Sequence, residues 1–340
     1  MADTEPSKPS AAAAEYLRES LAPATLQCYE TAWIRKERYS AENKVNTLPA
    51  SPIDVGNFIS EVAKESYCSF SSIKRLTAAI NYRHELANLV SPTSSSFCKR
   101  VMTGIEKALF RHPRQKKPMT TQIARTLIEK YLAADLHSGK TTNIVHWRTI
   151  TRVILEFITG SRFGEVIALR PCDFTFTDQD MTLFIRKSKT DQKMVGANKT
   201  VVRDSESPFL CPVHITEQYL ARLGYPASSE FSIMPQFRST QGRNSRVTSV
   251  IPGSSVSHST AIGDLKSLLA SIGINPAEYG EHSGRSGCAT ESYAAGADIP
   301  EIQQKVGWAS GATAAHYVQS SPETKRRKSD LFRISDGARK

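Results

Sequence analysis

Apolar residues recur every three or four positions through the first part of the chain, which predicts a bundle of helices over residues 11–110. Pro23 interrupts the first apolar run and divides it into two helices. Ser51 followed by Pro52 is typical of a capped helix start, so a further helix is expected there. Residues 1–10 are polar and contain proline, and we expect them to be disordered. The apolar positions of the expected helices are Leu17, Leu21, Leu26, Tyr29, Trp33, Val55, Phe58, Ile59, Val62, Ile73, Leu76, Ile80, Leu86, Phe97, Val101, Ile105, Ala108 and Leu109.

The pattern changes after residue 119, where helical and strand-like runs follow one another. Helices are expected over residues 120–136, 144–159, 212–223 and 259–271. A small antiparallel sheet is expected from residues 173–177, 181–187 and 200–203. Residues 229–257 are rich in Ser, Arg and Gln with little periodicity and predict a surface loop. The sequence therefore predicts a mainly α fold, with an N-terminal helical bundle and a mixed α/β domain over residues 120–320.

Residues 111–119 separate these two halves and contain two prolines among basic side chains. Proline prevents a continuous helix, so the segment is predicted to be a basic linker. A solvated connection would need nothing more than this composition. A cationic strap that follows a phosphate backbone while two domains close around it is the functional interpretation, and we favour it.

Three short helices are expected in the stretch from His282 to Tyr317. His282 and Arg285 lie three positions apart, so both side chains fall on one face of a first helical turn. A helix ends at Gly296, a second begins after Asp298 and ends at Gly307, and a third carries the tyrosine. Trp308 follows the second helix and is expected at the edge of a loop.

The residue types in this stretch suit the cleavage of a phosphodiester by a tyrosine oxygen. His282, Arg285, the Trp308 indole and the Tyr317 hydroxyl are suitable groups, but such a site needs a second arginine and an acid for the departing oxygen. Arg162 follows the turn after the apolar helix 144–159, with Glu165 one helical turn further on. Lys189 follows an expected strand and could reach the 5′ oxygen from a mobile tip. Each of these side chains taken alone is more often a surface or core residue, so the interpretation depends on their joint spacing.

The 340 residues are long enough for two domains, and the formal charge of +11 with a pI near 9.4 favours a polyanionic partner. Charge alone does not separate nucleic acid from acidic lipid or protein. The six cysteines, Cys28, Cys68, Cys98, Cys172, Cys211 and Cys288, form no CxxC pair, so neither a disulfide framework nor a zinc site is indicated. No apolar run approaches the roughly 20 residues that span a bilayer, and a soluble protein in a reducing compartment is expected.

The order and intervals of seven residues resemble the tyrosine recombinase (phage integrase) family. These residues are Arg162, Glu165, Lys189, His282, Arg285, Trp308 and Tyr317. The match is specific over residues 160–320 and is a match of pattern over 20–110. It implies a core-binding, SAM-like helical bundle followed by a catalytic domain of the tyrosine recombinase and type IB topoisomerase kind.

The resemblance also implies a chemistry: cleavage and rejoining of DNA through a 3′-phosphotyrosine and a Holliday junction, with no metal, ATP or other cofactor. Tyr317 would attack phosphorus while Arg162 and Arg285 hold the scissile phosphate. His282 would bind the phosphate or accept the tyrosine proton, and Lys189 would protonate the leaving oxygen.

The remaining positions have supporting roles in this interpretation. Trp308 would donate its N–H and pack the site. Glu165 would steady its own helix and orient His282 or Arg162. Lys187, Lys193 and Lys199 compete with Lys189 for the role of the acid.

The expected partner is double-stranded DNA that carries a specific short, inverted-repeat site, bound by a homotetramer on two sites that is a monomer or weak dimer when free. An ordinary solvated face would also explain the basic residues of the N-terminal half. The resemblance favours DNA contacts, and no membrane partner is expected. The candidate DNA-binding residues are Arg35, Lys36, Lys74, Arg75, Arg83, Lys99, Arg100, Arg114, Lys116 and Lys117.

Residues 321–340 form a short tail whose apolar residues Leu331, Phe332 and Ile334 are too few to form a core. We expect this tail to dock on a neighbouring subunit. An intracellular location in contact with DNA is expected, which is the cytoplasm or nucleoid for a bacterial or phage protein and the nucleus for a eukaryotic mobile element. A type IB topoisomerase, a hairpin-forming resolvase and a catalytically inactive DNA-binding protein are the alternative functions.

Overall fold

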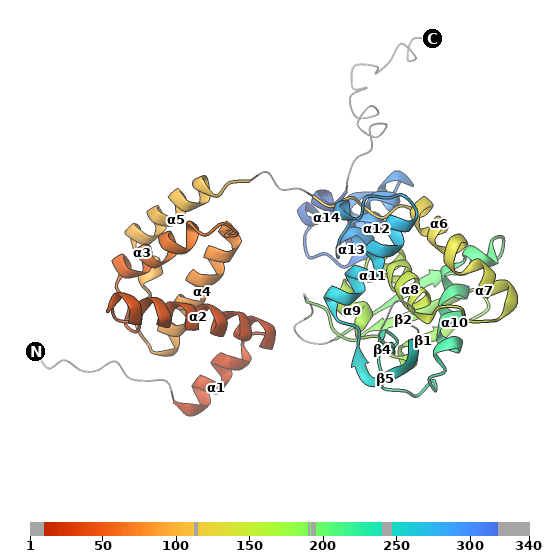
Figure 1. Cartoon of the computed structure of the whole chain (residues 1–340), viewed down its shortest axis with the longest axis horizontal. Coiled ribbons are helices and arrows are strands. Elements are labelled where there is room, and N and C mark those ends of the chain that lie inside the picture. Colours follow the sequence, from red (N-terminus) through yellow and green to blue (C-terminus); the bar gives the residue numbers. More distant parts are fainter. Residues whose placement is uncertain (1–9, 112–114, 190, 192–194, 240–246, 319–340) are drawn as a thin grey trace, which may run out of the picture. The chain divides into compact units, whose positions relative to one another are not determined.

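The chain forms two compact units, one before Gln115 and one from Gln115 onward, in a computed structural model (Figure 1). The structure describes residues 10–111, 115–189, 191, 195–239 and 247–318. Of the expected disordered segment 1–10, residues 1–9 lie outside the described residues, and Ser10 caps α1; the expected docking tail 321–340 also lies outside them. No helix in the described part is long and apolar enough to cross a membrane.

The first unit is helical, as the apolar periodicity predicts. Its elements are α1 (Ala11–Glu19), α2 (Pro23–Asn43), α3 (Pro52–Ala63), α4 (Phe70–Leu86), the 3₁₀ turn η1 (Pro92–Ser94) and α5 (Ser96–Ala108). The Ser51 side chain accepts the N–H of Asp54 and caps α3, with proline at its first turn. Helix α2 packs on α4 and α3 packs on α5, around a core that includes Trp33, Phe58 and Ile80.

The second unit combines helices with two small antiparallel sheets, which confirms the predicted fold class. Its helices are α6 (Thr121–Tyr131), α7 (Ala133–Ser138), α8 (Ile144–Thr159), α9 (Phe163–Ile167), α10 (Pro212–Leu223), α11 (His258–Ser271), α12 (Ser283–Ala294), α13 (Ile299–Val306) and α14 (Gly311–Tyr317). The strands are β1 (Phe174–Phe176), β2 (Asp180–Ile185), β3 (Ala197–Val202), β4 (Pro235–Ser239) and β5 (Val247–Ser255). Single 3₁₀ turns are η2 (Pro171–Asp173), η3 (Pro208–Leu210) and η4 (Pro276–Glu278).

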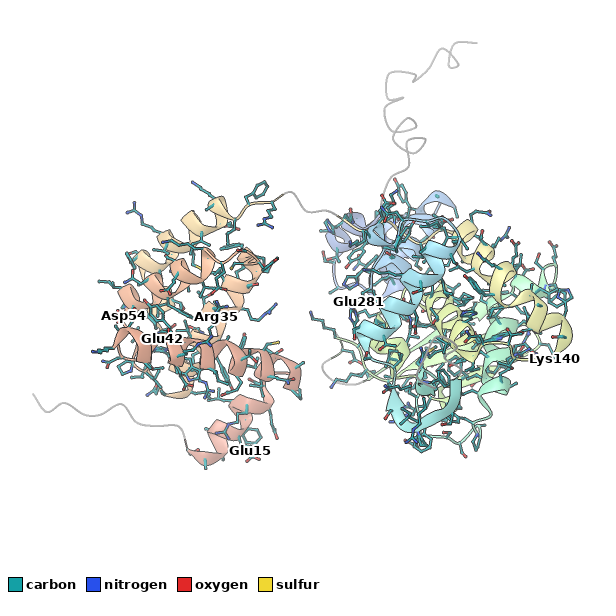
Figure 2. The ribbon with its side chains drawn as sticks, viewed as in Figure 1. Glu15, Arg35, Glu42, Asp54, Lys140 and Glu281 are labelled. Carbon is teal, nitrogen blue, oxygen red and sulfur yellow. The ribbon has the colours of Figure 1, made fainter. Side chains whose placement is uncertain are left out.

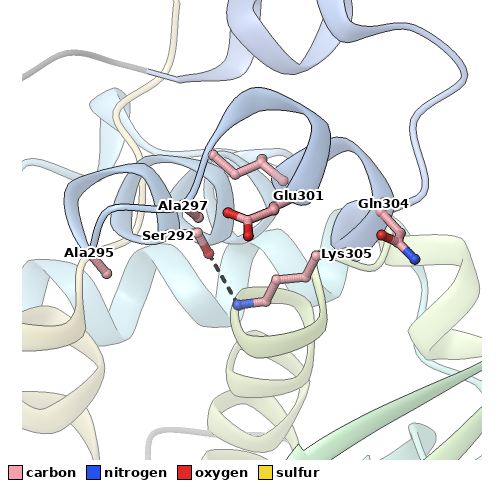
Figure 3. A pocket seen from close by; sticks show the side chains of 7 residues that line it. Ser292, Ala295, Ala297, Glu301, Gln304 and Lys305 are labelled. Atoms are coloured by element: carbon pink, nitrogen blue, oxygen red, sulfur yellow. Dashed lines mark hydrogen bonds between the residues drawn. The ribbon is translucent and has the colours of Figure 1, made fainter.

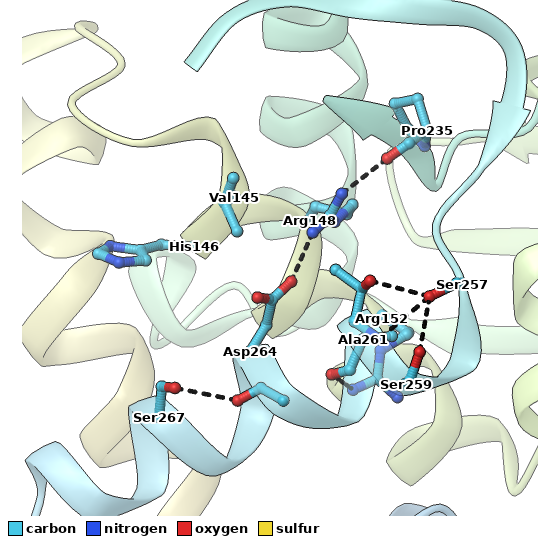
Figure 4. A network of polar contacts seen from close by, with 12 residues as sticks. Val145, His146, Arg148, Arg152, Pro235, Ser257, Ser259, Ala261, Asp264 and Ser267 are labelled. Atoms are coloured by element: carbon cyan, nitrogen blue, oxygen red, sulfur yellow. Dashed lines mark hydrogen bonds and ion pairs between the residues drawn. The ribbon is translucent and has the colours of Figure 1, made fainter. Parts of the chain in front are cut away.

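Helix α8 lies at the centre of the second unit, in contact with α6, α10, α11 and α12. It carries charge as well as apolar residues into the core (Figure 4). Arg148 donates to the Pro235 carbonyl at 2.7 Å and to the Asp264 carboxylate at 2.6 Å. Arg152 and Glu156, both nearly inaccessible, pair at 2.6 Å. Because an unpaired buried charge is costly, the Arg148–Asp264 pair fixes how α8 meets α11, whereas the Arg152–Glu156 pair lies within α8 itself.

The sequence predictions were wrong in two places in this unit. The expected helix over 120–136 is broken at Leu132, and the continuation is the separate helix α7. The expected surface loop over 229–257 contains β4 and β5, which pair as a two-stranded antiparallel ribbon. This pairing is made by main-chain hydrogen bonds between strands rich in polar residues. The alternation of apolar and polar residues that usually predicts a strand is therefore absent from these two segments.

Helix α12 packs closely on α8 and on the chain that enters the unit. A Cβ atom added to Gly284 would lie 2.9 Å from Cβ of Glu156, and one added to Gly287 would lie 2.2 Å from the Met119 carbonyl oxygen. The Lys117 N–H donates to the Glu278 carbonyl at 2.8 Å and the Met119 N–H to the Ser283 carbonyl at 2.8 Å. Residues 115–119 therefore run along the segment before α12 and fix its start.

Candidate active site

Arg285 is a buried arginine on the first turns of α12, with 2% of its surface exposed. Its Nη1 donates to the Gly160 carbonyl oxygen at the end of α8. Its Nη2 is buried and has no hydrogen-bond partner among the described residues. A buried donor without a partner costs free energy, so this atom is prepared for an acceptor that binds there.

Arg162 is the residue before α9 and is half-buried. Glu165 holds it twice: the carboxylate accepts the Arg162 main-chain N–H at 2.8 Å and the guanidinium Nη1 at 2.7 Å. Burial, with the charge of Arg162 adding to it and that of Glu165 opposing it, lowers the pKa of Arg285 to about 10. The two guanidinium groups thus lie close enough to repel each other, which favours an anion between or beside them.

The Trp308 indole contacts both Arg285 and Tyr317. Helix α13 ends at Gly307, whose φ of 75° turns the chain so that the buried Trp308 follows directly. The Arg285 guanidinium lies 4.8 Å from the indole centroid. The Tyr317 ring stacks on the same indole at 4.9 Å between centroids with an interplanar angle of 29°. Tryptophan faces attract cations, so the indole supports the arginine as well as the tyrosine.

The main chain of the tyrosine helix is held by side chains from two other segments. Ser286 and Thr290 of α12 donate to the Tyr317 carbonyl at 3.2 and 3.4 Å. The Gln115 amide donates to the His316 carbonyl at 3.1 Å. These donors satisfy carbonyls that the end of a helix leaves free. Tyr317 is therefore attached to the helix that carries Arg285 in the same chain.

His282 is exposed at the residue before α12. Its ring meets the Tyr317 ring edge to face at 6.2 Å between centroids. Its place beside the phenol leaves it accessible to a ligand on the surface of the site.

The candidate lysines for the role of the acid differ in their surroundings. Lys189 and Lys187 are exposed on the connection between β2 and β3, and Lys193 lies outside the described residues. Lys199 on β3 lies among the site residues, because its ammonium donates to the Thr159 carbonyl at 2.6 Å and to the Lys305 carbonyl at 3.3 Å. Burial, opposed by the charge of Glu165 and assisted by those of Arg285 and Arg162, lowers the pKa of Lys199 to about 8.

The register in which β2 and β3 pair indicates that Lys199 faces inward. Lys199 lies opposite the buried Leu183 across the antiparallel pair of β2 and β3. Opposite residues in such a pair project to the same face of the sheet, so the lysine points toward the core. The register depends on where β2 ends and β3 begins, and the sequence alone does not show these two positions.

The candidate DNA-binding residues of the first unit differ in exposure. Lys36 is buried, with its ammonium 2.6 Å from the Ser40 hydroxyl and near the rings of Tyr39 and Phe58, so its prediction as a surface contact is wrong. Its position three residues after Trp33 places it on the apolar face of α2. Arg35 is partly exposed (Figure 2) and pairs with Glu65.

The other candidates in that unit are accessible to different degrees. Arg83 pairs with Glu30 and lies 5.4 Å from the Trp33 ring. The exposed candidates are Lys74, Arg75, Lys99 and Arg100.

The candidates after the first unit lie along the chain entering the second. Arg114 lies outside the described residues. Lys117 pairs with Glu278 at 2.9 Å, and the Lys116 ammonium donates to the Ala277 carbonyl at 2.6 Å. Both are exposed, so these internal contacts coexist with accessible positive charge.

An open hollow of about 610 Å³ lies between α12 and α13 (Figure 3). The Lys305 ammonium donates to the Ser292 hydroxyl at 3.1 Å within it. Its lining residues are Ser292, Ala295, Ala297, Glu301, Ile302, Gln304 and Lys305. None of these is a predicted site residue, although the Lys305 carbonyl accepts from Lys199 of the site.

Comparison with known sequences gives one family and one curated relative. A sequence model described as the phage integrase family matches residues 128–324. The integrase/recombinase XerD homolog of Selenomonas ruminantium is 25% identical over 207 residues. The matched part is 60% of this chain and 58% of that protein, so the chain spans less than two thirds of the relative.

Solved structures share the fold at low sequence identity. XerH recombinase bound to palindromic difH substrate superposes with a TM-score of 0.57 at 14% identity, covering 90% of this chain and 79% of that one. The Tn1549 transposon integrase in complex with transposon right end DNA gives 0.52 at 12%, covering 91% and 99%. A lambda integrase dimer bound to a core site gives 0.51 at 14%, covering 91% and 94%. The motif spacing also predicts a particular similarity to Cre recombinase, which these comparisons do not test.

Proposed function

Because the chain belongs to the phage integrase family, we propose that it is a site-specific DNA recombinase that cleaves and rejoins strands through Tyr317. The single observation that carries this proposal is the buried, unpartnered Nη2 of Arg285 beside the Tyr317 and Trp308 rings. A non-bridging phosphate oxygen satisfies such a donor, and a guanidinium offers the second N–H that a phosphate accepts.

The net charge of the site supports a phosphate over a neutral ligand. Arg162, Arg285 and Lys199 contribute three formal positive charges. The Glu165 carboxylate, which interacts with Lys199 and Arg285, contributes one negative charge. Phosphodiester cleavage passes through a phosphorane-like transition state with more negative charge than the ground state. Positive groups held in place before the reaction stabilise that state without reorganising.

The reaction exchanges one phosphate ester for another. The Tyr317 phenol oxygen bonds to phosphorus while the bond from phosphorus to the 5′ oxygen breaks. The phenol proton passes to His282 or to solvent, and Lys189 protonates the 5′ oxygen, which leaves as a hydroxyl. The product is a 3′-phosphotyrosine. Attack by a 5′-hydroxyl from another strand reverses the steps and needs no ATP, because the ester bond is conserved.

Two further residues position or shield the reacting groups. Glu165 fixes the direction of the Arg162 guanidinium through its two hydrogen bonds. Trp308 fills the space between the arginine and the phenol and keeps bulk water away from both.

Recombination requires more than one copy of the site, so the working form is a homotetramer on two DNA sites that passes through a Holliday junction. XerH and lambda integrase are each described bound to DNA, the latter as a dimer. The tail 321–340 is the proposed segment that joins neighbouring subunits. Deleting it from residue 329 should reduce tetramer yield on DNA more than binding to a single site.

The test is a covalent adduct on a nicked duplex. Selection of bound DNA from a random pool supplies the sequence, and a nick close to the scissile phosphate lets the short 5′-hydroxyl fragment diffuse away and traps the intermediate. Wild-type protein should give a protein–DNA band that resists denaturant. Tyr317→Phe should give none, while Tyr225→Phe, which removes a hydroxyl elsewhere in the same unit, should match wild type. Adduct formation by Tyr317→Phe would refute the proposal.

The alternative functions give different results with the same protein. A type IB topoisomerase relaxes supercoiled DNA that lacks the selected site. A hairpin-forming resolvase yields closed ends, and an inactive DNA-binding protein gives specific binding without an adduct. Strand exchange between two selected sites supports recombination against all three.

A further inference from the structure

Two helices of the second unit end against each other beside the active site. A Cβ atom added to Gly160, after the last residue of α8, would lie 2.8 Å from a methyl carbon of Val306, the last residue of α13. The carbonyls at a helix end lack intrahelical partners, and each end carries roughly half a negative charge. Bringing two such ends together is unfavourable unless a cation lies between them.

Lys199 supplies that cation. Its ammonium donates to the Thr159 carbonyl at the end of α8 and to the Lys305 carbonyl in the last turn of α13, at 2.6 and 3.3 Å. The next carbonyl along α8, that of Gly160, receives Arg285. Consecutive carbonyls of one helix end are thus taken by a strand lysine and by the buried arginine.

The segments that follow these two ends carry site residues. Two residues after Gly160 the chain reaches Arg162, and directly after Gly307 it reaches Trp308. Any change in how α8 and α13 meet moves the two residues relative to Arg285. A contact at the junction between the ends of α8 and α13 therefore affects the positions of Arg162 and Trp308 around the phosphate.

We propose that Lys199 is a positioning residue that joins the ends of α8 and α13 and so sets the spacing of Arg162, Arg285 and Trp308 around the scissile phosphate. This inference rests on the proposed function. It assigns Lys199 a role distinct from the general acid, because two of the three ammonium hydrogens are directed to main-chain carbonyls. The leaving oxygen is protonated by another group, for which Lys189 is the proposed candidate.

The decisive experiment varies the leaving group. A duplex in which sulfur replaces the bridging 5′ oxygen leaves as a thiolate and needs no acid, so a variant that lacks only the acid regains its rate on this substrate. We expect Lys199→Met to form adduct on the order of 10²-fold more slowly on the oxygen duplex, as a small misplacement of reacting groups does, and to be equally impaired on the sulfur duplex. Lys189→Met should be slow on oxygen and near wild type on sulfur.

Two further variants separate positioning from a general loss of fold. Lys199→Arg keeps a charged donor and should recover part of the rate. Because burial lowers the pKa of Lys199 to about 8, its charge is present below that pH and lost above it. The rate of wild type relative to Lys199→Arg should therefore fall as pH rises through about 8. Lys130→Met is the matched control, since the Lys130 ammonium donates to the Ser271 carbonyl at the end of α11, and it should keep the wild-type rate.

Hydrogen exchange tests the junction without any reaction. The Gly307 and Trp308 N–H groups donate to the Gln303 carbonyl, so their exchange reports how α13 ends. Lys199→Met should exchange faster there, and Lys130→Met should not. Unchanged exchange in Lys199→Met, or recovery of its rate on the sulfur duplex, would overturn the proposal. If wild type forms no adduct on either duplex, the recombinase function fails, and the exchange result still decides the role of Lys199.

Discussion

The two units use positive charge differently. In the first unit most of the candidate cations lie on the surface, alone or paired with an exposed carboxylate as in Arg35 with Glu65. In the second unit the important ones are inside: Arg148, Arg152 and Arg285 are each at most 3% exposed and each has a main-chain or carboxylate partner. Exposed charge attracts any polyanion at long range, whereas a buried and oriented guanidinium recognises one group in one position. The first unit is suited to holding DNA, and the second to acting on a single phosphate.

The largest effect should come from breaking a buried pair beneath the site. Glu156→Ala leaves Arg152 without its carboxylate in the core, which should lower the free energy of unfolding of the second unit by about 3–5 kcal/mol. Burial also raises the pKa of Glu156, and Arg152 opposes that shift. Chemical denaturation followed by circular dichroism measures the change. Glu230→Ala, which removes the exposed partner of Arg170, is the control and should cost under about 1 kcal/mol. Equal losses in the two variants would show that burial does not set the value of these pairs.

Replacing the buried arginine by lysine should have the next largest effect. Arg285→Lys keeps the charge but loses the fork that reaches the Gly160 carbonyl and the phosphate together. Removing one such donor typically costs about 2.7–4 kcal/mol of transition-state stabilisation, a rate loss of 10²–10³-fold. The rate of adduct formation under single-turnover conditions, with binding to the selected duplex measured separately, tests this. A wild-type rate would mean that charge alone is enough and that the fork has no role.

The sequence predicted the second unit's site better than its supports. The positions of His282, Arg285, Trp308 and Tyr317 were predicted from spacings on short helices, where three or four residues make one turn and geometry is local. Arg162 lies far upstream and was chosen because the chemistry needs a second arginine and because the family resemblance includes it. Positions that depend on distant chain pairing were not accessible in this way. Lys199 faces inward only because β2 and β3 pair in one register, and the ribbon of β4 and β5 is made by main-chain bonds between polar strands.

The first unit shows the opposite limit. Its helices and core follow from apolar periodicity, and the same periodicity decides which of its basic residues face inward. Neighbouring positions on a helix point about 100° apart, so Arg35 faces outward while Lys36 joins the stripe of Trp33 and Ser40. Considering the helical face before the charge would have placed Lys36 in the core.

Acid should weaken the first unit through a buried histidine. The His84 Nε2 accepts the Ala50 N–H at 3.1 Å and its Nδ1 lies 2.8 Å from the Ile80 carbonyl, an arrangement that suits the neutral ring with a proton on Nδ1. Burial lowers the pKa of His84, and the nearby Lys36 lowers it further. A depressed histidine pKa means that the unfolded state binds the proton more readily. Stability is therefore full above the ordinary value near 6.5 and falls as pH drops through that value toward the folded pKa.

Thermal unfolding between pH 8 and pH 5 measures this effect, with His84→Gln as the comparison. The variant keeps a hydrogen-bonding side chain that does not titrate, so its melting temperature should depend less on pH over this range. An equally steep dependence in both proteins would assign the acid sensitivity to other groups.

The smallest effect should come from single surface cations of the first unit, and it bears most directly on the difference between the units. Lys74→Ala and Lys99→Ala each remove an exposed ammonium, which should weaken binding to every duplex alike and reduce the slope of log K against log salt by about 0.9. Lys36→Met removes a buried ammonium from the same unit and should leave that slope unchanged, because Lys36 cannot reach a phosphate. Titrations of DNA at several salt concentrations give the three slopes. If Lys36→Met reduced the slope as much as Lys74→Ala, exposure would not be what distinguishes the cations that hold DNA, and the contrast between a binding unit and a reacting unit would lose its physical basis.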